Sequence, residues 1–151
     1  MPVELTPRGT YGVRVSRGVP GPLMKAGQAL VSRLMRLRGI RVARLTTVGA
    51  RTGQERTTDL IALHDASNTW IVVASYAGSA NHPAWYFNMA RNPDRVWLDD
   101  GHGRVRVTAD TLSGGEREEA YAKLLRIWKG YAGYQQKTDR EIPVVRLTAM
   151  D

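Results

Sequence analysis

The sequence predicts a mainly β fold of the α+β class, a small and partly open β-barrel with helices packed across it. Two observations predict it: about six short segments have strand character, and three helical segments accompany them. Turn sequences separate several of the strands, which favours antiparallel neighbours. Such a mixture is typical of a sheet that curls on itself and is covered by helices.

The expected elements follow from periodicity and turn residues. Strands are expected at residues 42–48, 57–64, 70–76, 95–98, 104–112 and 142–147. The segment 70–76 is almost continuously apolar, as a strand buried on both faces would be. Helices are expected at 83–91 and at 114–129, the first with Pro83 in its first position and Asn81 or His82 as its cap.

The N-terminal part differs in composition from the rest. Residues 1–21 are rich in Gly and Pro, which predicts a flexible arm before a single domain at 22–151. Residues 22–38 have the spacing of an amphipathic helix, with Leu30, Leu34 and Leu37 on one face and basic residues opposite. We expect the apolar face to pack on the barrel. The alternative is that it lies on an anionic membrane surface.

Composition excludes several chemistries. The 151 residues contain no cysteine, so disulfides, zinc–thiolate sites and cysteine nucleophiles are excluded. The three histidines are too scattered to predict a metal site, and no Ser/His/Asp order indicates a hydrolase. No apolar run approaches the roughly 20 residues of a membrane span, and no secretory signal is visible. A cytoplasmic protein is expected.

The positive charge is concentrated in the first third of the chain. Residues 1–56 hold eleven Lys or Arg against two Asp or Glu, whereas residues 57–151 hold eleven against twelve. This asymmetry indicates an anionic partner: nucleic acid, an acidic membrane or a phosphate-bearing small molecule. Nucleic acid is disfavoured, because Tyr11 is the one aromatic residue before Trp70.

Residues 49–58 join two predicted strands and could hold an oxyanion. Gly49 and Gly53 permit tight backbone geometry, Arg51 and Arg56 provide planar cations, and threonine hydroxyls add donors. Phosphate needs donors of this kind. An exposed basic loop without function is the alternative interpretation.

Residues 75–88 run from a buried strand through small residues into a helix. A helix start favours an anion or an electron-rich ring edge. Trp85 and Asn88 share a helix face and would suit a planar, hydrogen-bonding ligand, although either could simply belong to the core. Phe87 is expected in the core. Farther along, Tyr131 and Tyr134 could line a substrate mouth or pin a helix end.

Three segments, 45–60, 72–94 and 130–147, together resemble the deazaflavin-dependent nitroreductase family. Their motifs are Thr-Gly-Gln-x-Arg, Pro-x-Trp-Tyr-x-Asn and Tyr-x-x-Tyr-Gln, in this order. The resemblance implies a split β-barrel, similar to FMN-binding proteins and usually dimeric. It implies the cofactor coenzyme F420, a deazaflavin with a phosphate and an oligoglutamate tail. It also implies hydride transfer to a quinone, an activated alkene (an enone, for example) or a nitroaromatic compound.

The resemblance also implies roles for individual residues. Those that would hold the phosphate and tail are Ala50, Arg51, Thr52 and Arg56. Those that would line the ring and ribityl chain are Thr57, Thr58, Asp59, Leu60, Ile61, Val73, Ala74, Ser75, Tyr76, Ala84, Trp85, Tyr86, Phe87 and Asn88. Tyr131 and Tyr134 would face the substrate, and Tyr134 and Ser75 are the catalytic candidates.

One position departs from the family pattern. This chain has Tyr76-Ala77-Gly78 where members often carry Lys-Gly-Gly, so a cation is missing beside the expected ring. FMN is the less favoured cofactor. Two different functions also stay open: a flavin- or lipid-binding split barrel without reductase activity, and a basic nucleic-acid-binding module. Contact with the cytoplasmic face of a membrane is compatible with a quinone as acceptor.

Overall fold

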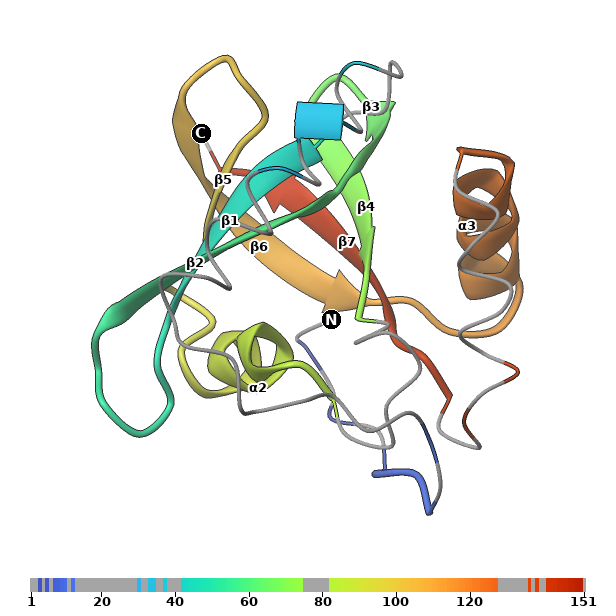
Figure 1. Ribbon diagram of the computed structural model, residues 1–151, viewed down its shortest axis with the longest axis horizontal. Coiled ribbons are helices and arrows are strands. Elements are labelled where there is room, and N and C mark those ends of the chain that lie inside the picture. The colour runs from blue at the N-terminus through green and yellow to red at the C-terminus, as the bar shows by residue number, and fades with distance from the viewer. Residues whose placement is uncertain are drawn as a thin grey trace.

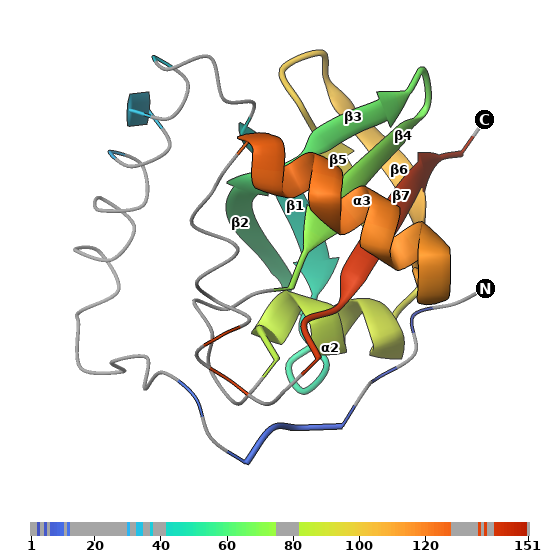
Figure 2. The same cartoon turned by 90° about the vertical axis from the view of Figure 1, so that its right-hand side faces the viewer.

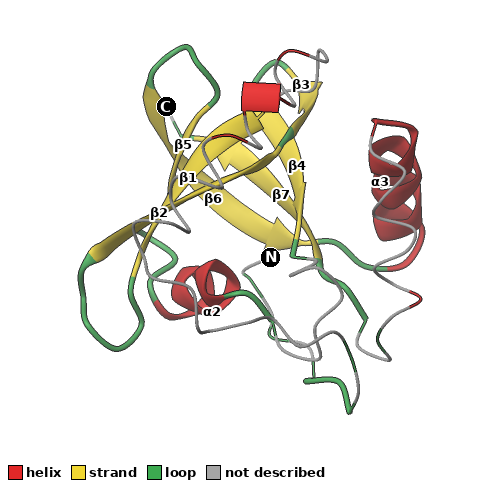
Figure 3. Cartoon of the chain, in the orientation of Figure 1, coloured by secondary structure: helices red, strands yellow, loops and turns green. Residues whose placement is uncertain are grey.

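The computed structural model describes residues 42–74, 82–127 and 141–150, together with the positions 3, 5, 7–10, 12, 30, 33, 34, 37, 136 and 138. Its elements, in chain order, are β1 (Val42–Val48), β2 (Glu55–Ile61), β3 (Leu63–Ala66), β4 (Thr69–Val73), α2 (Ala84–Arg91), β5 (Trp97–Asp99), β6 (Arg104–Thr111), α3 (Gly114–Ile127) and β7 (Val144–Ala149). Figure 3 shows the strands gathered in one curled sheet with the helices outside it.

The expected elements are confirmed within a few residues, with one difference in the strands. The predicted strand 57–64 is two strands, β2 and β3, which meet at Ala62. At this residue the chain changes its pairing partner from β1 to β4. Hydrophobic periodicity does not reveal which strand a segment pairs with, and the sequence therefore predicts six strands where the described residues form seven.

The sheet closes on itself through its own chain connectivity. Its strand order is β2-β1-β5-β6-β7-β4-β3, and every pairing is antiparallel. The two end strands, β2 and β3, are consecutive in sequence and separated by Ala62 alone, so the sheet must curl until its ends meet there. Figure 1 shows the curled sheet. Away from that corner, β2 and β4 are not paired neighbours. Among the described strands, the barrel is therefore split along the outer edge of β2, which pairs with none of them.

The interior of the barrel follows from the alternation of side chains along each strand. On β4 and the residue after it, Trp70, Val72 and Ala74 point inward and belong to one apolar cluster. The intervening Ile71 and Val73 belong to a second cluster on the outer face. This arrangement explains why the segment is apolar at every position, and it confirms a strand buried on both faces.

Helix α3 packs on the outer face of β4 and β7 (Figure 2). Its buried residues include Tyr121 and Leu124, the latter with no exposed surface. Arg117 fixes the helix to the segment that leads into β7, because its Nη2 donates a hydrogen bond of 2.7 Å to the carbonyl oxygen of Ile142. The second apolar cluster is thus independent of the barrel interior.

Helix α2 closes one end of the barrel (Figure 1). Tyr86 and Met89, three residues apart on one helix face, are fully buried in the inner cluster. Phe87 lies about 100° around the helix from Tyr86 and is 41% exposed, so the expectation of a core position is wrong. The expectation of Asn81 or His82 as the cap, with Pro83 in the first helical position, is also wrong, because Pro83 itself is the N-cap and no side-chain hydrogen bond caps the helix.

The predicted arm and N-terminal helix fall mostly outside the described residues. In the arm, Val3 packs against the inner cluster. Leu30, Leu34 and Leu37 are helical, as expected, but are 59%, 52% and 76% exposed. The expectation that they pack on the barrel is therefore wrong for these three leucines. Among the described residues, no helix combines the length and apolarity needed to cross a membrane.

Candidate active site

The loop between β1 and β2, residues 49–54, has a defined shape. The amide of Gly49 donates to the carbonyl of Gln54 (2.7 Å), and the amide of Gly53 donates to the carbonyl of Gly49 (2.9 Å). Gly53 has a φ of 70°, a left-handed conformation that favours glycine. A Cβ at Gly49 would lie 2.6 Å from the hydroxyl oxygen of Thr52, so a larger residue here would force that hydroxyl to move.

This loop presents unused donors. Thr52 Oγ1 accepts a hydrogen bond of 3.3 Å from the amide of Gln54. By contrast, the amides of Arg51 and Thr52 donate to no acceptor among the described residues. The exposed side chains of Arg51 and Arg56 likewise form no ion pair within that part of the chain. Free amides beside unpaired guanidinium groups are suited to an oxyanion.

Asn88 joins this loop to α2. Its Oδ1 accepts a hydrogen bond of 3.0 Å from the amide of Ala50, and its Nδ2 donates one of 3.1 Å to the hydroxyl of Thr47. One turn later, Asn92 Nδ2 donates to the carbonyl of Val48 at 3.3 Å. The structure thus brings the predicted anion loop and the predicted aromatic helix together. Asn88 itself is buried, and both of its polar atoms are engaged.

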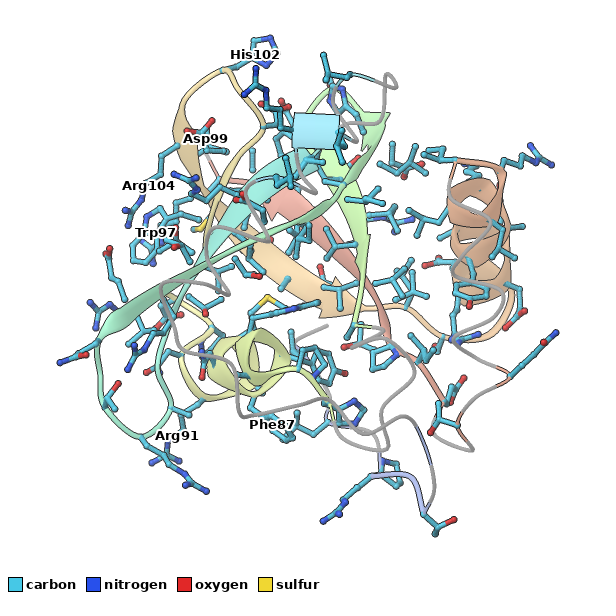
Figure 4. The ribbon with its side chains drawn as sticks, in the orientation of Figure 1. Phe87, Arg91, Trp97, Asp99, His102 and Arg104 are labelled. Carbon is cyan, nitrogen blue, oxygen red and sulfur yellow. The ribbon has the colours of Figure 1, made fainter. Side chains whose placement is uncertain are left out.

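The start of α2 carries a group of aromatic rings. Trp85 is half-buried, packs against the inner cluster and lies edge-on to Tyr86. The Tyr86 hydroxyl lies 3.2 Å from that of Thr111. His82 is buried and contacts both Tyr86 and Phe87, and Phe87 points away from the barrel (Figure 4). Ala84, Trp85 and Phe87 are therefore the residues of the predicted 84–88 run that keep accessible surface.

Strand alternation divides the predicted run 57–61 between two faces. Thr58 and Leu60 pair with inward-facing residues of β1, and Leu60 packs against the inner cluster. The other three residues face outward, and there Asp59 pairs with Arg44 at 3.2 Å while Ile61 packs in the cluster under α3. One ligand cannot touch both sets through side chains. The backbone edge of β2, which no other described strand covers, is the surface that all five residues share.

A second charged group borders the loop on the outer face of the sheet. Arg104 lies over the ring of Trp97, with its Cζ atom 4.2 Å from the ring centroid (Figure 4). Its Nη2 donates a hydrogen bond of 3.0 Å to Oε1 of Glu55. This hydrogen bond, helped by the positive charges of Arg104 and Arg95, holds the pKa of Glu55 below its ordinary value. The carboxylate at the start of β2 is therefore ionised and neutralised by Arg104.

The other predicted residues are only partly described. Val73 and Ala74, at the end of β4, are buried on opposite faces. Ser75, Tyr76, Tyr131 and Tyr134 lie outside the described residues. Over the part of the chain that the structure describes, no three His, Asp or Glu side chains cluster as metal ligands would.

Sequence reasoning missed the residues that hold the site together. Thr47 and Asn92 bind partners more than 40 positions away in sequence, and neither belongs to a recognisable motif. The alternation of Ala43, Leu45 and Thr47 could have placed the Thr47 hydroxyl inside the barrel. No comparable signal exists for Asn92, which reads as an ordinary helix end.

Comparisons with known proteins agree with this geometry. The family model described as F420H2-dependent quinone reductase matches residues 24–149. A quinone reductase of Mycobacterium tuberculosis, described as F420H2-dependent, is 39% identical over 109 residues, or 69% of this chain and 70% of that protein. A solved F420H2-dependent reductase is 37% identical, with a TM-score of 0.63, over 71% of this chain and 93% of that one.

A further solved structure, described as a domain-swapped dimer, is 32% identical with a TM-score of 0.64. It covers 84% of this chain and 99% of its own. The family match spans β1 to β7, and the two similar structures cover most of this chain. By sequence and by fold, this chain belongs to the F420H2-dependent quinone reductase family.

Proposed function

We propose that this split-barrel protein is an F420H2-dependent oxidoreductase that transfers a hydride to a quinone, with activated alkenes and nitroaromatic compounds as further acceptors. One observation carries the proposal. The hydrogen bonds of Asn88 hold an arginine-bearing loop with free amides against the helix that presents Trp85. An anion site beside an aromatic surface is what a ring attached to a phosphate requires.

The residues present fit such a cofactor. Arg51 and Arg56 would hold the phosphate, together with the free amides of Arg51 and Thr52. The half-buried ring of Trp85 and the outer edge of β2 would contact the flat deazaflavin. Neither surface depends on the Lys-Gly-Gly sequence that this chain lacks after Ser75. These arginine side chains and amides have no partner among the described residues, and the arginines are positively charged. Such a group of donors favours a polyanionic cofactor over FMN.

The cofactor, when bound, supplies the hydride; the chain supplies orientation and electrostatics. The rigid loop fixes the anionic end, because its shape depends on backbone bonds at Gly49 and Gly53. The N-terminal end of α2 adds a positive dipole beside the aromatic ring. Negative charge that develops on the acceptor would be met by a hydroxyl of Tyr134 or Ser75, the two candidates for guiding a proton.

Oxidation of reduced F420, followed by absorbance with a panel of quinones, enones and nitro compounds, tests the activity. Fluorescence titration with F420 and with FMN tests the cofactor. Arg51→Gln should weaken F420 binding roughly ten- to a hundredfold, since a charged hydrogen bond contributes about 1.5–3 kcal/mol. Tyr134→Phe should slow turnover more than it weakens binding. Absence of any F420 binding at low ionic strength would reject the proposal.

Two further features of the proposed function concern partners. The similar structure described as a domain-swapped dimer supports a homodimer, which analytical ultracentrifugation would test. The exposed Leu30, Leu34 and Leu37, within the basic first third of the chain, support contact of a cytoplasmic protein with an anionic membrane. Flotation with anionic and neutral liposomes tests this contact. Replacing the three leucines by Gln should abolish it without changing F420 affinity.

A further inference from the structure

The arginines of the described structure differ in their partners, and Arg106 on β6 and Arg126 on α3 are exposed without an ion pair among the described residues. Several on the sheet and on α3 are neutralised by carboxylates, as in the pairs Arg44–Asp59, Arg104–Glu55 and Arg146–Glu116. Four others surround the β1–β2 loop: Arg51, Arg56, Arg91 and Arg95. All four are exposed, and their side chains form no ion pair or hydrogen bond within the described residues.

The positions of Arg91 and Arg95 follow from the bonds between α2 and β1. Asn88 and Asn92 are anchored to Ala50 and Val48, so the last turn of α2 lies beside the loop, with Arg91 between the two anchors. Figure 4 shows Arg91 beside this loop and directed away from the barrel. The turn after α2, closed by the bond from the Arg95 amide to the Asn92 carbonyl, brings Arg95 close enough to Glu55 to favour its ionised form.

Few carboxylates offset this positive charge. Glu55 is already bound by Arg104, which leaves the exposed Asp94 as the acidic neighbour in the same turn. The dipole at a helix C-terminus favours a basic residue, and this accounts for Arg91. It does not account for Arg95, which lies beyond the helix, or for the concentration of unpaired arginines at one loop.

The order of groups along α2 matches the order of groups in the proposed cofactor. The aromatic residues lie at the start of the helix, Asn88 contacts the loop in the middle, and Arg91 lies at the end. From Asn88 to Arg91 the helix rises about 4.5 Å. A ligand with its ring at the helix start and its phosphate at the loop would therefore extend its remaining part toward Arg91 and Arg95.

We infer that Arg91 and Arg95 form a second anion subsite, which binds the carboxylates of the oligoglutamate tail while Arg51 and Arg56 hold the phosphate. The inference rests on the proposed function, since it takes the ring and phosphate positions from there. Both arginines are exposed, so the subsite is screened by salt and contributes modestly to affinity. The subsite would also favour other ligands that carry several carboxylates attached beyond a phosphate.

Fluorescence titration with two ligands tests the subsite: F420 with its oligoglutamate tail, and a truncated form that keeps the phosphate but has no glutamate. The wild-type protein should bind the tailed form more tightly at low salt. Arg91→Gln and Arg95→Gln should each weaken binding of the tailed form roughly two- to fivefold and leave the truncated form unchanged. Arg126→Gln, an exposed arginine at the end of α3, is the matched control and should change neither.

The outcomes separate the inference from the proposed function. Equal wild-type affinity for both ligands, or equal losses for both ligands in the Arg91 and Arg95 variants, would overturn the subsite and leave the cofactor assignment intact. Failure of the wild-type protein to bind either ligand would overturn the cofactor assignment itself. Arg51→Gln should weaken both ligands, which confirms that the truncated form occupies the same loop. Thermal denaturation of each variant establishes that the fold is unchanged.

Discussion

The backbone amide of Ala50 donates a hydrogen bond of 3.0 Å to Oδ1 of Asn88, across 38 positions of sequence. A second hydrogen bond runs from Asn88 Nδ2 to the hydroxyl of Thr47, inside the barrel. Through these two bonds the Asn88 side chain connects the barrel interior, the β1–β2 loop and α2. The orientation of the proposed phosphate site relative to Trp85 therefore depends on Asn88. The residue positions the site rather than offering a free group to a ligand.

Asn88→Ala should lower the free energy of unfolding by about 1–3 kcal/mol, because the buried Thr47 hydroxyl and the Ala50 amide lose their partner. It should also weaken F420 binding, measured by fluorescence titration. Leu124→Ala is the control: it leaves a cavity under α3 and should destabilise the protein by about 2–5 kcal/mol with little effect on affinity. Equal loss of affinity in the two variants would show that Asn88 acts only through overall stability.

The sequence predicted those features that depend on neighbours in the chain. Strands β1 and β4 and helices α2 and α3 follow from periodicity and from Pro and Gly positions, and all were placed within a few residues. Phe87 was misplaced because three aromatic residues in a row do not reveal which of them the helix turns inward; packing against the barrel selects Tyr86. The split of the predicted strand at Ala62 depends on the distant partner β4 in the same way.

The candidate site was predicted as two separate segments, and the resemblance to a family joined them. The residues alone predict no distance between the loop and the helix, because their relative position depends on the hydrogen bonds of Asn88 to Ala50 and of Asn92 to Val48. The tight loop geometry at Gly49 and Gly53 was predicted by residue type alone. The exposure of Leu30, Leu34 and Leu37 could not be predicted, since an amphipathic pattern shows which helix face is apolar but not what that face packs against.

The Glu55–Arg104 ion pair should control the charge beside the loop. In Arg104→Gln the Glu55 carboxylate loses its partner and attracts the neighbouring Arg56 and Arg95, which should weaken F420 binding about two- to threefold at low salt. Glu55→Gln should have the opposite effect, and the double variant should bind like the wild-type protein. Titrations at low and high salt measure the effect, which screening should remove. Arg106→Gln, a charge loss on the same strand, is the control; equal weakening by this variant would contradict a specific role for Arg104.

Asp100 should make stability depend on acid pH. Burial opposes its ionisation, but the bonds from His102 (3.1 Å) and Trp70 (3.2 Å) outweigh it and lower the pKa of Asp100. A lowered pKa in the folded state contributes stability that is present above the ordinary value of about 3.9 and is lost as the pH falls through the folded value. The contribution should be below about 1 kcal/mol, because Asp100 is only partly buried and its partner His102 is exposed.

Urea unfolding of wild-type protein and of Asp100→Asn at about pH 6 and about pH 3 measures this dependence. The difference in free energy of unfolding between wild type and Asp100→Asn should be smaller at the lower pH than at the higher one. Asp94→Asn, at an exposed position, is the control and should show no such convergence. A constant difference between wild type and Asp100→Asn at both pH values would show that the carboxylate acts through shape and not through charge.

Gly49→Ala should disturb the anion loop through one neighbour. The added Cβ would lie 2.6 Å from Thr52 Oγ1, so the hydroxyl must move and release the amide of Gln54. We expect F420 affinity to fall roughly three- to tenfold, the effect of about one hydrogen bond. Thr52→Ala removes the same hydroxyl directly. If the two changes act through it, the double variant should bind no worse than Thr52→Ala alone.

Gly53→Ala separates this effect from general strain in the loop. Its added Cβ meets nothing within 4 Å, but its φ of 70° makes the substitution strained, at a cost of about 1–2 kcal/mol in stability. It should therefore destabilise the protein while reducing affinity less than Gly49→Ala does. Thermal unfolding and fluorescence titration of the four variants distinguish the two mechanisms. Strictly additive losses in Gly49→Ala and Thr52→Ala would show that the two residues contribute independently, and the Thr52 hydroxyl would not be the point at which the glycine acts.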